Sequence, residues 1–312
     1  MTGGRESGQA GWKLVTYQAK TGPKAGVLAG DVVYEASALG LSATVLDLLN
    51  DWEASQHRIG EALQSVTPDA GTPLAAVELL APVLYPGTIF LAGINYHDHR
   101  QEMAERRKAL GESGEVDEIE APWHTVVASR PCVVGTGARV AIPGENVNLD
   151  WEAELAVIIG KRASKVTEAT AMAYVAGYTI ANDLSARALS RRKDVRPSST
   201  FRIDWMRHKS FDGACPLGPA ITPAAQVADP HQLGIRLWVG DALMQDSNTN
   251  QMIFGIAAQI ARISETTTLC PGDVILTGCP AGTGSSHGRY LEGGDTVTVE
   301  IDGLGQLETH II

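Results

Sequence analysis

The sequence predicts a β-rich α+β protein with a small N-terminal domain and a larger second domain. Many short apolar or alternating segments after residue 88 are typical of strands, and few helical spacings lie between them. A turn-rich segment, residues 66–87, separates these strands from an N-terminal unit with its own strand and helix patterns. We therefore divide the chain into a domain of residues 1–82 and a domain of residues 83–312.

The N-terminal domain contains a predicted β unit followed by a helix. Residues 12–19 (WKLVTYQA) predict a strand, residues 20–26 a turn, and residues 26–36 a hairpin that turns at Gly30-Asp31. Residues 43–65 have helical spacing, and the apolar face of that helix carries Val45, Leu48 and Leu49.

The second domain begins with a predicted strand, residues 88–95, and a charged helix, residues 96–110. Residues 111–123 are acidic and interrupted by Gly and Ser, which favours a surface loop. Helices are expected at roughly 167–174 and 250–263. The other strand candidates are Thr125–Val134, Arg139–Ile142, Leu155–Ile159, Tyr178–Asn182, Ile235–Val239, Val274–Leu276 and Val297–Ile301.

Net charge, apolar runs and cysteine spacing limit the classes of protein to which this chain can belong. The formal net charge of −11 over 312 residues argues against nucleic-acid binding and against anionic membrane surfaces. No apolar run is long enough to span a membrane, and the N-terminal segment lacks the apolar core of a signal peptide. The four cysteines form no Cys-x-x-Cys pair. We expect a cytoplasmic enzyme-sized protein with reduced thiols.

Carboxylates cluster at the start of one predicted strand, LDWEAELAVIIG (residues 149–160). Glu152 and Glu154 are two positions apart, so they project from the same face about 7 Å apart along the backbone. Alone, this pair is more typical of a strand that emerges into solvent. Asp183 follows another apolar strand and changes the balance, because three carboxylates suit a hard divalent cation. No His or Cys has suitable spacing with them, which favours magnesium or manganese over zinc.

A histidine and a carboxylate share one face of the predicted charged helix. His99 and Glu102 are three residues apart and can hydrogen-bond. A histidine oriented by a carboxylate is a common general base near neutral pH. The pair alone is also compatible with a solvated surface pair, and His97 is a competing candidate.

Other features are interpreted as structural. The basic run 190–194 is expected to be a solvated face, and Asp246–Asn248 a turn that helps to start a helix. Residues 279–288 (CPAGTGSSHG) lack the lysine of a phosphate-binding loop and favour a turn or active-site loop. Core positions are expected for the aromatic residues Trp205, Trp238 and Phe254.

Together these residues resemble the fumarylacetoacetate hydrolase family from about Pro86 to the C-terminus. The resemblance rests on ordered motifs: GINYHDHRQEM, LDWEAELAVIIGKRA, YVAGYTIANDLSAR, HKSFDGACPLGPAI, RLWVGDALMQDSNTNQMIF, PGDVILTGCPAG and GGDTVTVEIDGLG. It implies a mixed β-sandwich roll with a small N-terminal β-rich domain, a Mg²⁺ or Mn²⁺ site and a homodimer.

The resemblance also implies roles for individual residues. The family's metal ligands fall on Glu152, Glu154 and Asp183, while Asp150 receives no metal role and is interpreted as a turn or supporting residue. The family's catalytic dyad and lysine fall on His99, Glu102 and Lys209.

The implied reaction is hydrolysis of a C–C bond in a 2,4-dioxo acid of the acylpyruvate type. The metal polarises the 2-oxo group, His99 held by Glu102 activates water, and Lys209 helps to stabilise the enolate leaving group. The helix of His99 and the stretch to Glu120 are expected to act as a lid. The alternatives are decarboxylation of oxaloacetate-like acids, isomerisation or hydration of a 2-oxo-enoate, and a non-catalytic binding protein.

Departures from the family pattern affect the expected substrate pocket. Arg130 is a nearby cation where members carry a lysine, Ser190 stands in place of a Gln, and Cys279 in place of a Thr. We expect these positions to line the pocket away from the metal. The full set of expected substrate-binding residues is Arg187, Ser190, Thr277, Gly278, Cys279 and Arg130.

Overall fold

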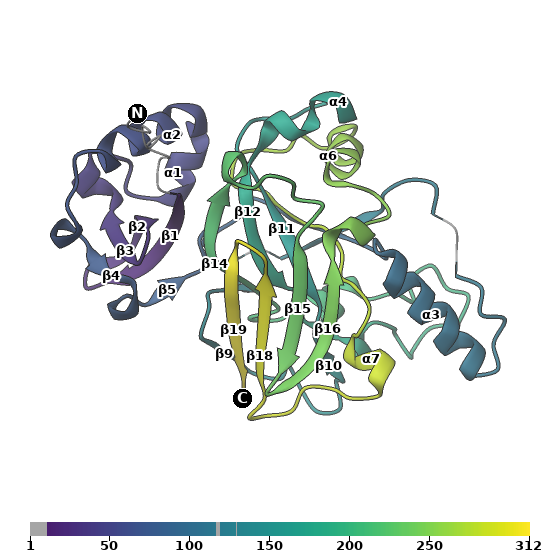
Figure 1. The fold of residues 1–312 in the computed structure, drawn as a ribbon. Coiled ribbons are helices and arrows are strands. Elements are labelled where there is room, and N and C mark those ends of the chain that lie inside the picture. The colour runs from purple at the N-terminus through teal and green to yellow at the C-terminus, as the bar shows by residue number, and fades with distance from the viewer. Residues whose placement is uncertain (1–10, 117–118, 129) are drawn as a thin grey trace, which may run out of the picture.

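The computed structural model describes residues 11–116, 119–128 and 130–312, and most of its strands belong to two large sheets. Residues 1–10 of the N-terminal segment and 117–118 of the acidic loop lie outside the described residues. Figure 1 shows the N-terminal strands and helices on one side of the molecule, and α3 and α7 on the other. The predicted β-rich α+β class is confirmed.

The larger sheet has twelve strands and runs through both halves of the chain. Ten of its strands follow the order β4 (Thr72–Pro73), β3 (Val32–Glu35), β2 (Gly22–Ala29), β1 (Trp12–Ala19), β14 (Cys215–Pro223), β12 (Val175–Asn182), β11 (Ala153–Ile159), β17 (Val274–Leu276), β6 (Ile89–Ala92) and β7 (His124–Val127). Two short strands join this path, β5 (Leu79–Leu80) on β1 and β8 (Val133–Val134) on β14. Pairing of β1 with β14 attaches the N-terminal strands to the rest, while the predicted domain boundary at residue 82 stays a prediction.

The second sheet has five strands and packs on one face of the larger one. Its order is β16 (Ala242–Asn248), β15 (Gly234–Val239), β18 (Thr296–Ile301), β19 (Gly305–Ile311) and β9 (Ala138–Val140). A separate two-stranded pair joins β10 (Leu149–Asp150) to β13 (Ser185–Ala186). Most pairings are antiparallel; β17–β6, β14–β8 and β19–β9 are parallel.

Helices cover the sheets and carry part of the functional site. In chain order they are α1 (Val45–Asn50), α2 (Trp52–Leu63), α3 (His97–Ala109), α4 (Glu168–Ala171), α5 (Trp205–Lys209), α6 (Ile256–Ser264) and α7 (Gly284–His287). Within the described ranges, no helix is long and apolar enough to cross a membrane.

Strand β11 is buried on both faces, which explains its nearly continuous apolar run. Leu155, Val157 and Ile159 belong to the core shared with the five-stranded sheet. Ala156 and Ile158 face the opposite way, into the core formed with the N-terminal strands, α1 and α2. The strand therefore links the two cores, and its first residues open into a cavity.

Several predicted elements need correction. Strand β2 begins at Gly22 and crosses the predicted turn, and the predicted helix 43–65 breaks at Asp51 into α1 and α2. The predicted strand Thr125–Val134 is two strands with different partners, because Pro131 lacks the N–H that a continuous ladder requires. Residues Asp246–Asn248 end strand β16, and Asn248 caps the 3₁₀ turn Thr249–Gln251, not helix α6.

Candidate active site

A cavity of about 160 Å³ lies where strand β11 begins and strands β6 and β12 end. Its apolar lining includes Leu91, Ile94, Met103 and Trp205. Its titratable lining residues come from five separate segments of the chain, and they are His99, Glu152, Glu154, Asp183, Arg187, His208, Lys209 and Cys279.

Three carboxylates at this cavity are buried. Glu152, Glu154 and Asp183 are only 7%, 1% and 2% exposed, which excludes the surface interpretation of the glutamate pair. The Ser185 hydroxyl donates to Glu152 Oε1 over 3.0 Å, and the Gly278 N–H donates to Glu154 Oε2 over 2.6 Å. Strand pairing brings them together, because Ala153 lies opposite Asn182 in the β11–β12 ladder.

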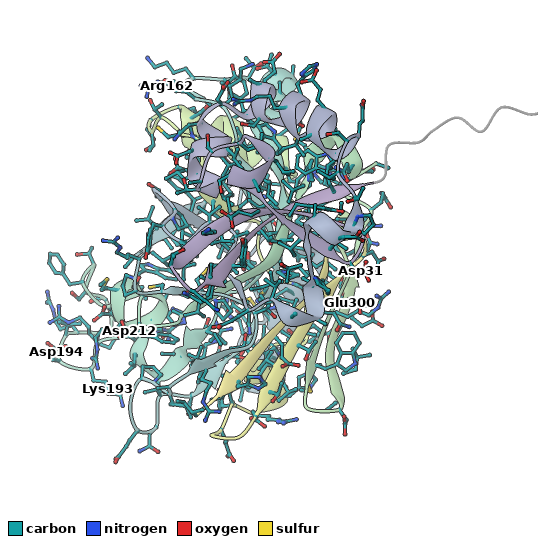
Figure 2. All side chains as sticks on the ribbon, turned by 90° about the vertical axis from the view of Figure 1, so that its left-hand side faces the viewer. Asp31, Arg162, Lys193, Asp194, Asp212 and Glu300 are labelled. Atoms are coloured by element: carbon teal, nitrogen blue, oxygen red, sulfur yellow. The ribbon has the colours of Figure 1, made fainter. Side chains whose placement is uncertain are left out.

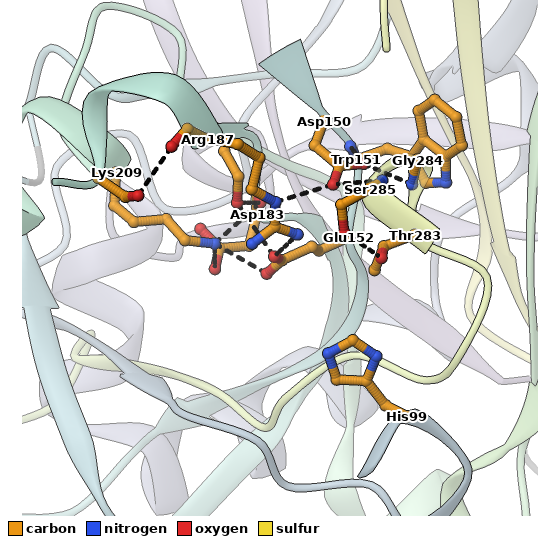
Figure 3. A network of polar contacts seen from close by, with 12 residues as sticks. His99, Asp150, Trp151, Glu152, Asp183, Arg187, Lys209, Thr283, Gly284 and Ser285 are labelled. Atoms are coloured by element: carbon orange, nitrogen blue, oxygen red, sulfur yellow. Dashed lines mark hydrogen bonds and ion pairs between the residues drawn. The ribbon is translucent and has the colours of Figure 1, made fainter. Parts of the chain in front are cut away.

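Two cationic side chains link Glu152 to the carboxylates of Asp183 and Asp150 (Figure 3). The Lys209 ammonium lies 2.8 Å from Glu152 Oε2 and 2.5 Å from Asp183 Oδ2. The Arg187 guanidinium lies 2.5 Å from Glu152 Oε1 and 2.8 Å from Asp150 Oδ2. Burial with charge-assisted hydrogen bonds makes this network rigid, so its geometry is pre-organised.

The electrostatic environment shifts the pKa values of the three carboxylates in different directions. Burial opposes ionisation of Glu152, but Lys209 and Arg187 outweigh it and hold the pKa of Glu152 below its usual range. Burial, together with Asp183 and Glu152, raises the pKa of Glu154 well above its usual value. Burial, with Glu152 alongside, raises the pKa of Asp183 to about 7, although Lys209 acts in the opposite direction. Without a bound cation these shifts favour the protonated form of Glu154 and, near neutral pH, partly that of Asp183, so full ionisation of the site requires a compensating positive charge.

The donor set fits a divalent cation. When Asp150, Glu152, Glu154 and Asp183 are all ionised, Lys209 and Arg187 compensate two of the four charges, and a bound divalent cation would compensate the other two. Donor atoms of Glu152, Glu154 and Cys279 all lie within 4.8 Å of one another. Oxygen donors from Glu152 and Glu154 suit magnesium or manganese. In this arrangement Asp183 is held by Lys209 and lies outside that group of three.

Cys279 lies elsewhere than expected. We predicted that it lines the pocket away from the metal and that no cysteine accompanies the carboxylates. The structure instead places its sulfur beside Glu152 and Glu154, since β17 pairs with β11 and the chain after β17 passes the start of β11. Sequence spacing cannot reveal this proximity, because 125 residues separate Glu154 from Cys279.

His99 and Glu102 form the predicted pair on helix α3. His99 Nδ1 lies 3.3 Å from Glu102 Oε2, and the Gly282 N–H donates to Glu102 Oε1 over 2.9 Å. Burial opposes ionisation of Glu102, but hydrogen bonds from His99, Ser286 and Gly282 lower its pKa overall. Glu102 therefore stays ionised and orients the imidazole, and Figure 3 shows His99 across an opening from the Glu152–Asp183–Lys209 cluster.

Asp98 is a supporting residue that sequence reasoning missed. Its Oδ1 accepts a hydrogen bond from the backbone N–H of His99 over 2.7 Å, and its Oδ2 accepts one from the Ser247 hydroxyl over 2.5 Å. An acidic residue in the first turn of a helix is favourable, and this one also ties α3 to the end of β16. The competing candidate His97 does not line the cavity.

Asp150 supports the site from behind. It is fully buried, and it accepts N–H groups of Gly284 and Ser285 over 2.6 and 3.0 Å as well as the Arg187 Nε. The backbone amides at the start of α7 are thus already paired with a carboxylate. The Gly-rich segment 279–288 is therefore a loop of this site, which agrees with its expected role as an active-site loop.

The predicted substrate-binding residues divide into two groups. Arg187 and Cys279 line the cavity. The side chains of Thr277 and Ser190 are engaged with backbone carbonyls of Leu155 and Arg187. Gly278 reaches the site only through its N–H, and Arg130 is an exposed residue over the ring of Tyr85. The structure does not bring Arg130, Ser190 or Thr277 to the cavity.

Two further lining residues come from helix α5. Trp205, interpreted from sequence as core, is only partly buried and lines the cavity. Its ring contacts the ring of His208, with centroids 5.6 Å apart, and that of Trp123 at 5.2 Å. No pattern in the sequence singles out His208, which gains its position from the short helix that also carries Lys209.

The chain belongs to the fumarylacetoacetate hydrolase family. The family described as "Fumarylacetoacetate (FAA) hydrolase C-terminal" matches residues 88–312, and the members define a class of metal-dependent enzymes. This match confirms the family and the fold inferred from the motifs, and it supports a metal-dependent enzyme, while C–C bond hydrolysis stays a prediction.

Several similar proteins carry names that refer to 2-oxo acids. The chain is 35% identical over 310 residues to oxaloacetate tautomerase FAHD2B, mitochondrial, of Bos taurus, covering 96% of this chain and 91% of that protein. It is 39% identical to oxaloacetate tautomerase fahd2, mitochondrial, of Xenopus laevis over 240 residues, which are 76% of this chain and 69% of that protein. Maleylpyruvate hydrolase from Sphingobium sp. SYK-6, solved with manganese(II) and pyruvate, has a TM-score of 0.73 and 28% identity, covering 96% of this chain and 98% of that one.

Proposed function

We propose that this enzyme interconverts the enol and keto forms of a small dicarboxylic 2-oxo acid such as oxaloacetate. The observation that carries the proposal is the oriented imidazole of His99 opposite the buried Glu152–Asp183–Lys209 cluster, across a cavity of about 160 Å³. A base on one side and a charge-stabilising cluster on the other is what enolisation beside a carbonyl requires. The similarity to oxaloacetate tautomerases supports the same reaction.

In the proposed reaction, the chain's residues move one proton off the substrate and return one. In the keto-to-enol direction, His99 takes a proton from the carbon next to the 2-oxo group, and the imidazolium that forms returns it to the enolate oxygen. Glu102 holds the imidazole in orientation, while the Lys209 ammonium offsets negative charge that develops on the oxygen. Glu152 and Glu154, with Asp183 or Cys279, would hold a Mg²⁺ or Mn²⁺ ion, which would supply Lewis-acid polarisation of the substrate when bound.

A second candidate is the hydrolysis of an acylpyruvate C–C bond predicted from the sequence. It uses the same site, with His99 taking a proton from water before attack on the distal carbonyl. The presence of both His99 and Glu102 favours it, as does the similarity to maleylpyruvate hydrolase. We place it second because three curated relatives that match over 91% of their own length carry the oxaloacetate tautomerase name.

A substrate panel distinguishes these reactions. Purified protein with Mg²⁺ or Mn²⁺ is mixed with enol-oxaloacetate, maleylpyruvate and acetylpyruvate, and products are followed by absorbance and by chromatography. We expect accelerated ketonisation of enol-oxaloacetate without loss of carbon. Release of pyruvate from the two acylpyruvates, with no effect on enol-oxaloacetate, would replace the first candidate by the second.

Replacement of His99, the proposed general base, can be compared with replacement of a second histidine in the same chain. His99→Gln should lower the rate about 10²-fold or more, since it removes a positioned general base. His57 forms a pair with Glu61 at the same 3.3 Å distance on helix α2, but both are exposed. His57→Gln should leave the rate unchanged. Equal rates for His99→Gln and the wild type would remove His99 from the mechanism.

The cellular location of the protein and its oligomeric state are separate from the proposed reaction. A cytoplasmic location stays a prediction, and the similar tautomerases are mitochondrial by name. The homodimer also stays a prediction. Neither affects the chemistry proposed for the cavity.

A further inference from the structure

His208 is a buried polar side chain at the cavity whose polar atoms have no protein partner. It is 6% exposed, and among the residues that the structure describes neither Nδ1 nor Nε2 finds a hydrogen-bond partner. Leaving two buried ring nitrogens unpaired is costly, and such groups in folded proteins call for a specific explanation.

The surroundings of His208 direct its ring to the cavity. The backbone N–H of His208 donates to the carbonyl of Asp204, the residue that precedes α5. The two ring nitrogens are the polar atoms of His208 without a partner among the residues that the structure describes. One face of the ring contacts Trp205 at a tilt of 34°. The residue lines the same cavity as His99 and Lys209. A ligand in that cavity is therefore the partner that the ring can reach.

The ligand group that fits His208 is an oxygen with negative charge. The ring is outside the group of donor atoms formed by Glu152, Glu154 and Cys279, so it is not placed as a metal ligand. Burial, reinforced by Lys209 and Arg187 and opposed by Glu152, lowers the pKa of His208 to about 3. The imidazole at neutral pH thus has one N–H donor beside two cationic side chains.

We infer that His208 donates a hydrogen bond to the second carboxylate of the substrate, the one not attached to the 2-oxo carbon. It thereby selects dicarboxylic over monocarboxylic 2-oxo acids. This inference deepens the proposed function, because oxaloacetate differs from pyruvate by that carboxylate. A site whose polar group stays unpaired with the wrong ligand discriminates strongly against it.

Two unreactive ligands test the inference without turnover. L-Malate and L-lactate differ by one carboxylate and are the 2-hydroxy counterparts of oxaloacetate and pyruvate. Their dissociation constants are measured by calorimetry with Mn²⁺ present for the wild type, His208→Phe and His208→Gln. His208→Phe keeps a planar ring against Trp205 but has no nitrogen, and His208→Gln keeps a donor.

We expect the wild type to bind malate more tightly than lactate. His208→Phe should weaken malate binding about tenfold or more and leave lactate binding within about twofold, a change of the size seen when a hydrogen bond to a charged group is lost. His208→Gln should recover part of the malate affinity. His124→Phe, which changes a histidine outside the cavity, serves as the control.

Equal weakening of both ligands in His208→Phe overturns the inference, because it assigns the residue a packing role. Equal affinities of the wild type for malate and lactate overturn it as well. If His208→Phe does not fold, judged by thermal unfolding, His208→Leu replaces it. The inference and the proposed reaction can fail separately. If His208→Phe loses the preference for malate but the wild type does not ketonise enol-oxaloacetate, the inference is supported and the proposed reaction is rejected.

Discussion

Cys279 changes the expected metal chemistry of the carboxylate site. A thiol that lies within 4.8 Å of two glutamate oxygens offers a soft ligand next to hard ones. Burial, with Glu152 and Glu154 nearby, raises the pKa of Cys279 well above its usual value, so the sulfur becomes a thiolate only if a bound cation compensates the charge. Sulfur coordination would shift the preference from magnesium towards later transition metals.

Cobalt(II) reports directly on this sulfur. The Co²⁺-loaded wild type should show a near-ultraviolet sulfur-to-cobalt charge-transfer band, and Cys279→Ser should lose the band while it still binds one Co²⁺. Cys270→Ser changes a cysteine outside the cavity and should keep the band. A wild-type spectrum without the band would restrict the donors to oxygen.

His208 also makes stability depend on pH. The neutral ring is favoured in the folded protein, where its pKa is about 3, compared with about 6.5 in an unfolded chain. The unfolded state therefore binds more protons between these values, and stability falls as the pH drops through this window. The slope from this residue is about 1.4 kcal/mol per pH unit.

Urea unfolding at several pH values checks this contribution. The free energy of unfolding of His208→Phe should decrease less steeply than that of the wild type between pH 6.5 and pH 5. The ring faces Lys209, Arg187 and Glu152, and of these groups only Glu152 stabilises the protonated form. Parallel pH curves for the two proteins would show that His208 does not titrate in this range.

The sequence predicted some site residues and could not predict others, for a physical reason. The period of two along a strand placed Glu152 and Glu154 together, and helical spacing paired His99 with Glu102. Both are local relationships. Cys279 reaches the two glutamates because β17 pairs with β11, and helix α5 brings His208 to the cavity; no local pattern encodes such proximity.

At the scale of elements, Asp150 joins three segments behind the cavity. It ends strand β10, accepts two N–H groups at the start of α7 and pairs with Arg187. The loop before α7 also binds Glu102 through the Gly282 N–H. The position of helix α3, which carries the proposed base, thus depends on the same loop that Asp150 anchors.

Asp150→Asn should destabilise the protein by about 3–5 kcal/mol, because it removes one of the two buried carboxylates that pair with Arg187 and weakens the acceptor for the α7 N–H groups. Denaturant unfolding measures the loss. Asp194→Asn breaks an exposed pair with Arg192, whose loop lies at the periphery in Figure 2, and should leave the stability nearly unchanged. Similar small losses in both variants would contradict the anchoring role of Asp150.

Strands with unusual composition escaped prediction. β14 reads CPLGPAITP, and its Gly218-Pro219 step is typical of a turn. The strand persists because β1, β8 and β12 pair with different parts of it. β19 reads GQLETHI, where Leu307, Thr309 and Ile311 face the core and polar residues alternate with them. Its apolar positions are too few to predict a strand without the neighbouring β18.

At the scale of the whole molecule, exposed apolar side chains offer a surface for the predicted homodimer. Helix α5 and the segment before it expose Phe201, Ile203 and Met206 by 71%, 45% and 63%, and nearby Trp123 is 43% exposed. Large apolar side chains gathered on one surface are typical of an interface. The fold class was predictable at this scale, because it follows from the density of short strands.

Sedimentation velocity tests this surface. The wild type should sediment as a dimer, and Met206→Glu should shift it towards the monomer by placing a charge in an apolar contact. Leu110→Glu changes a residue that is 68% exposed at the end of α3 and should have no effect. A monomeric wild type would make the homodimer prediction wrong, and an unchanged Met206→Glu dimer would place the interface elsewhere.

The pairing of β1 with β14 has a consequence for truncated forms of the enzyme. A fragment that starts near residue 83 would keep every residue of the cavity yet lose β1, α1 and α2. The backbone edge of β14 would then be open, and Ala156 and Ile158 of β11 would face water directly beyond Glu154. Such an edge is a template for aggregation. The N-terminal unit therefore covers the edge of β14 and one apolar face of β11, the strand that begins beside the carboxylates.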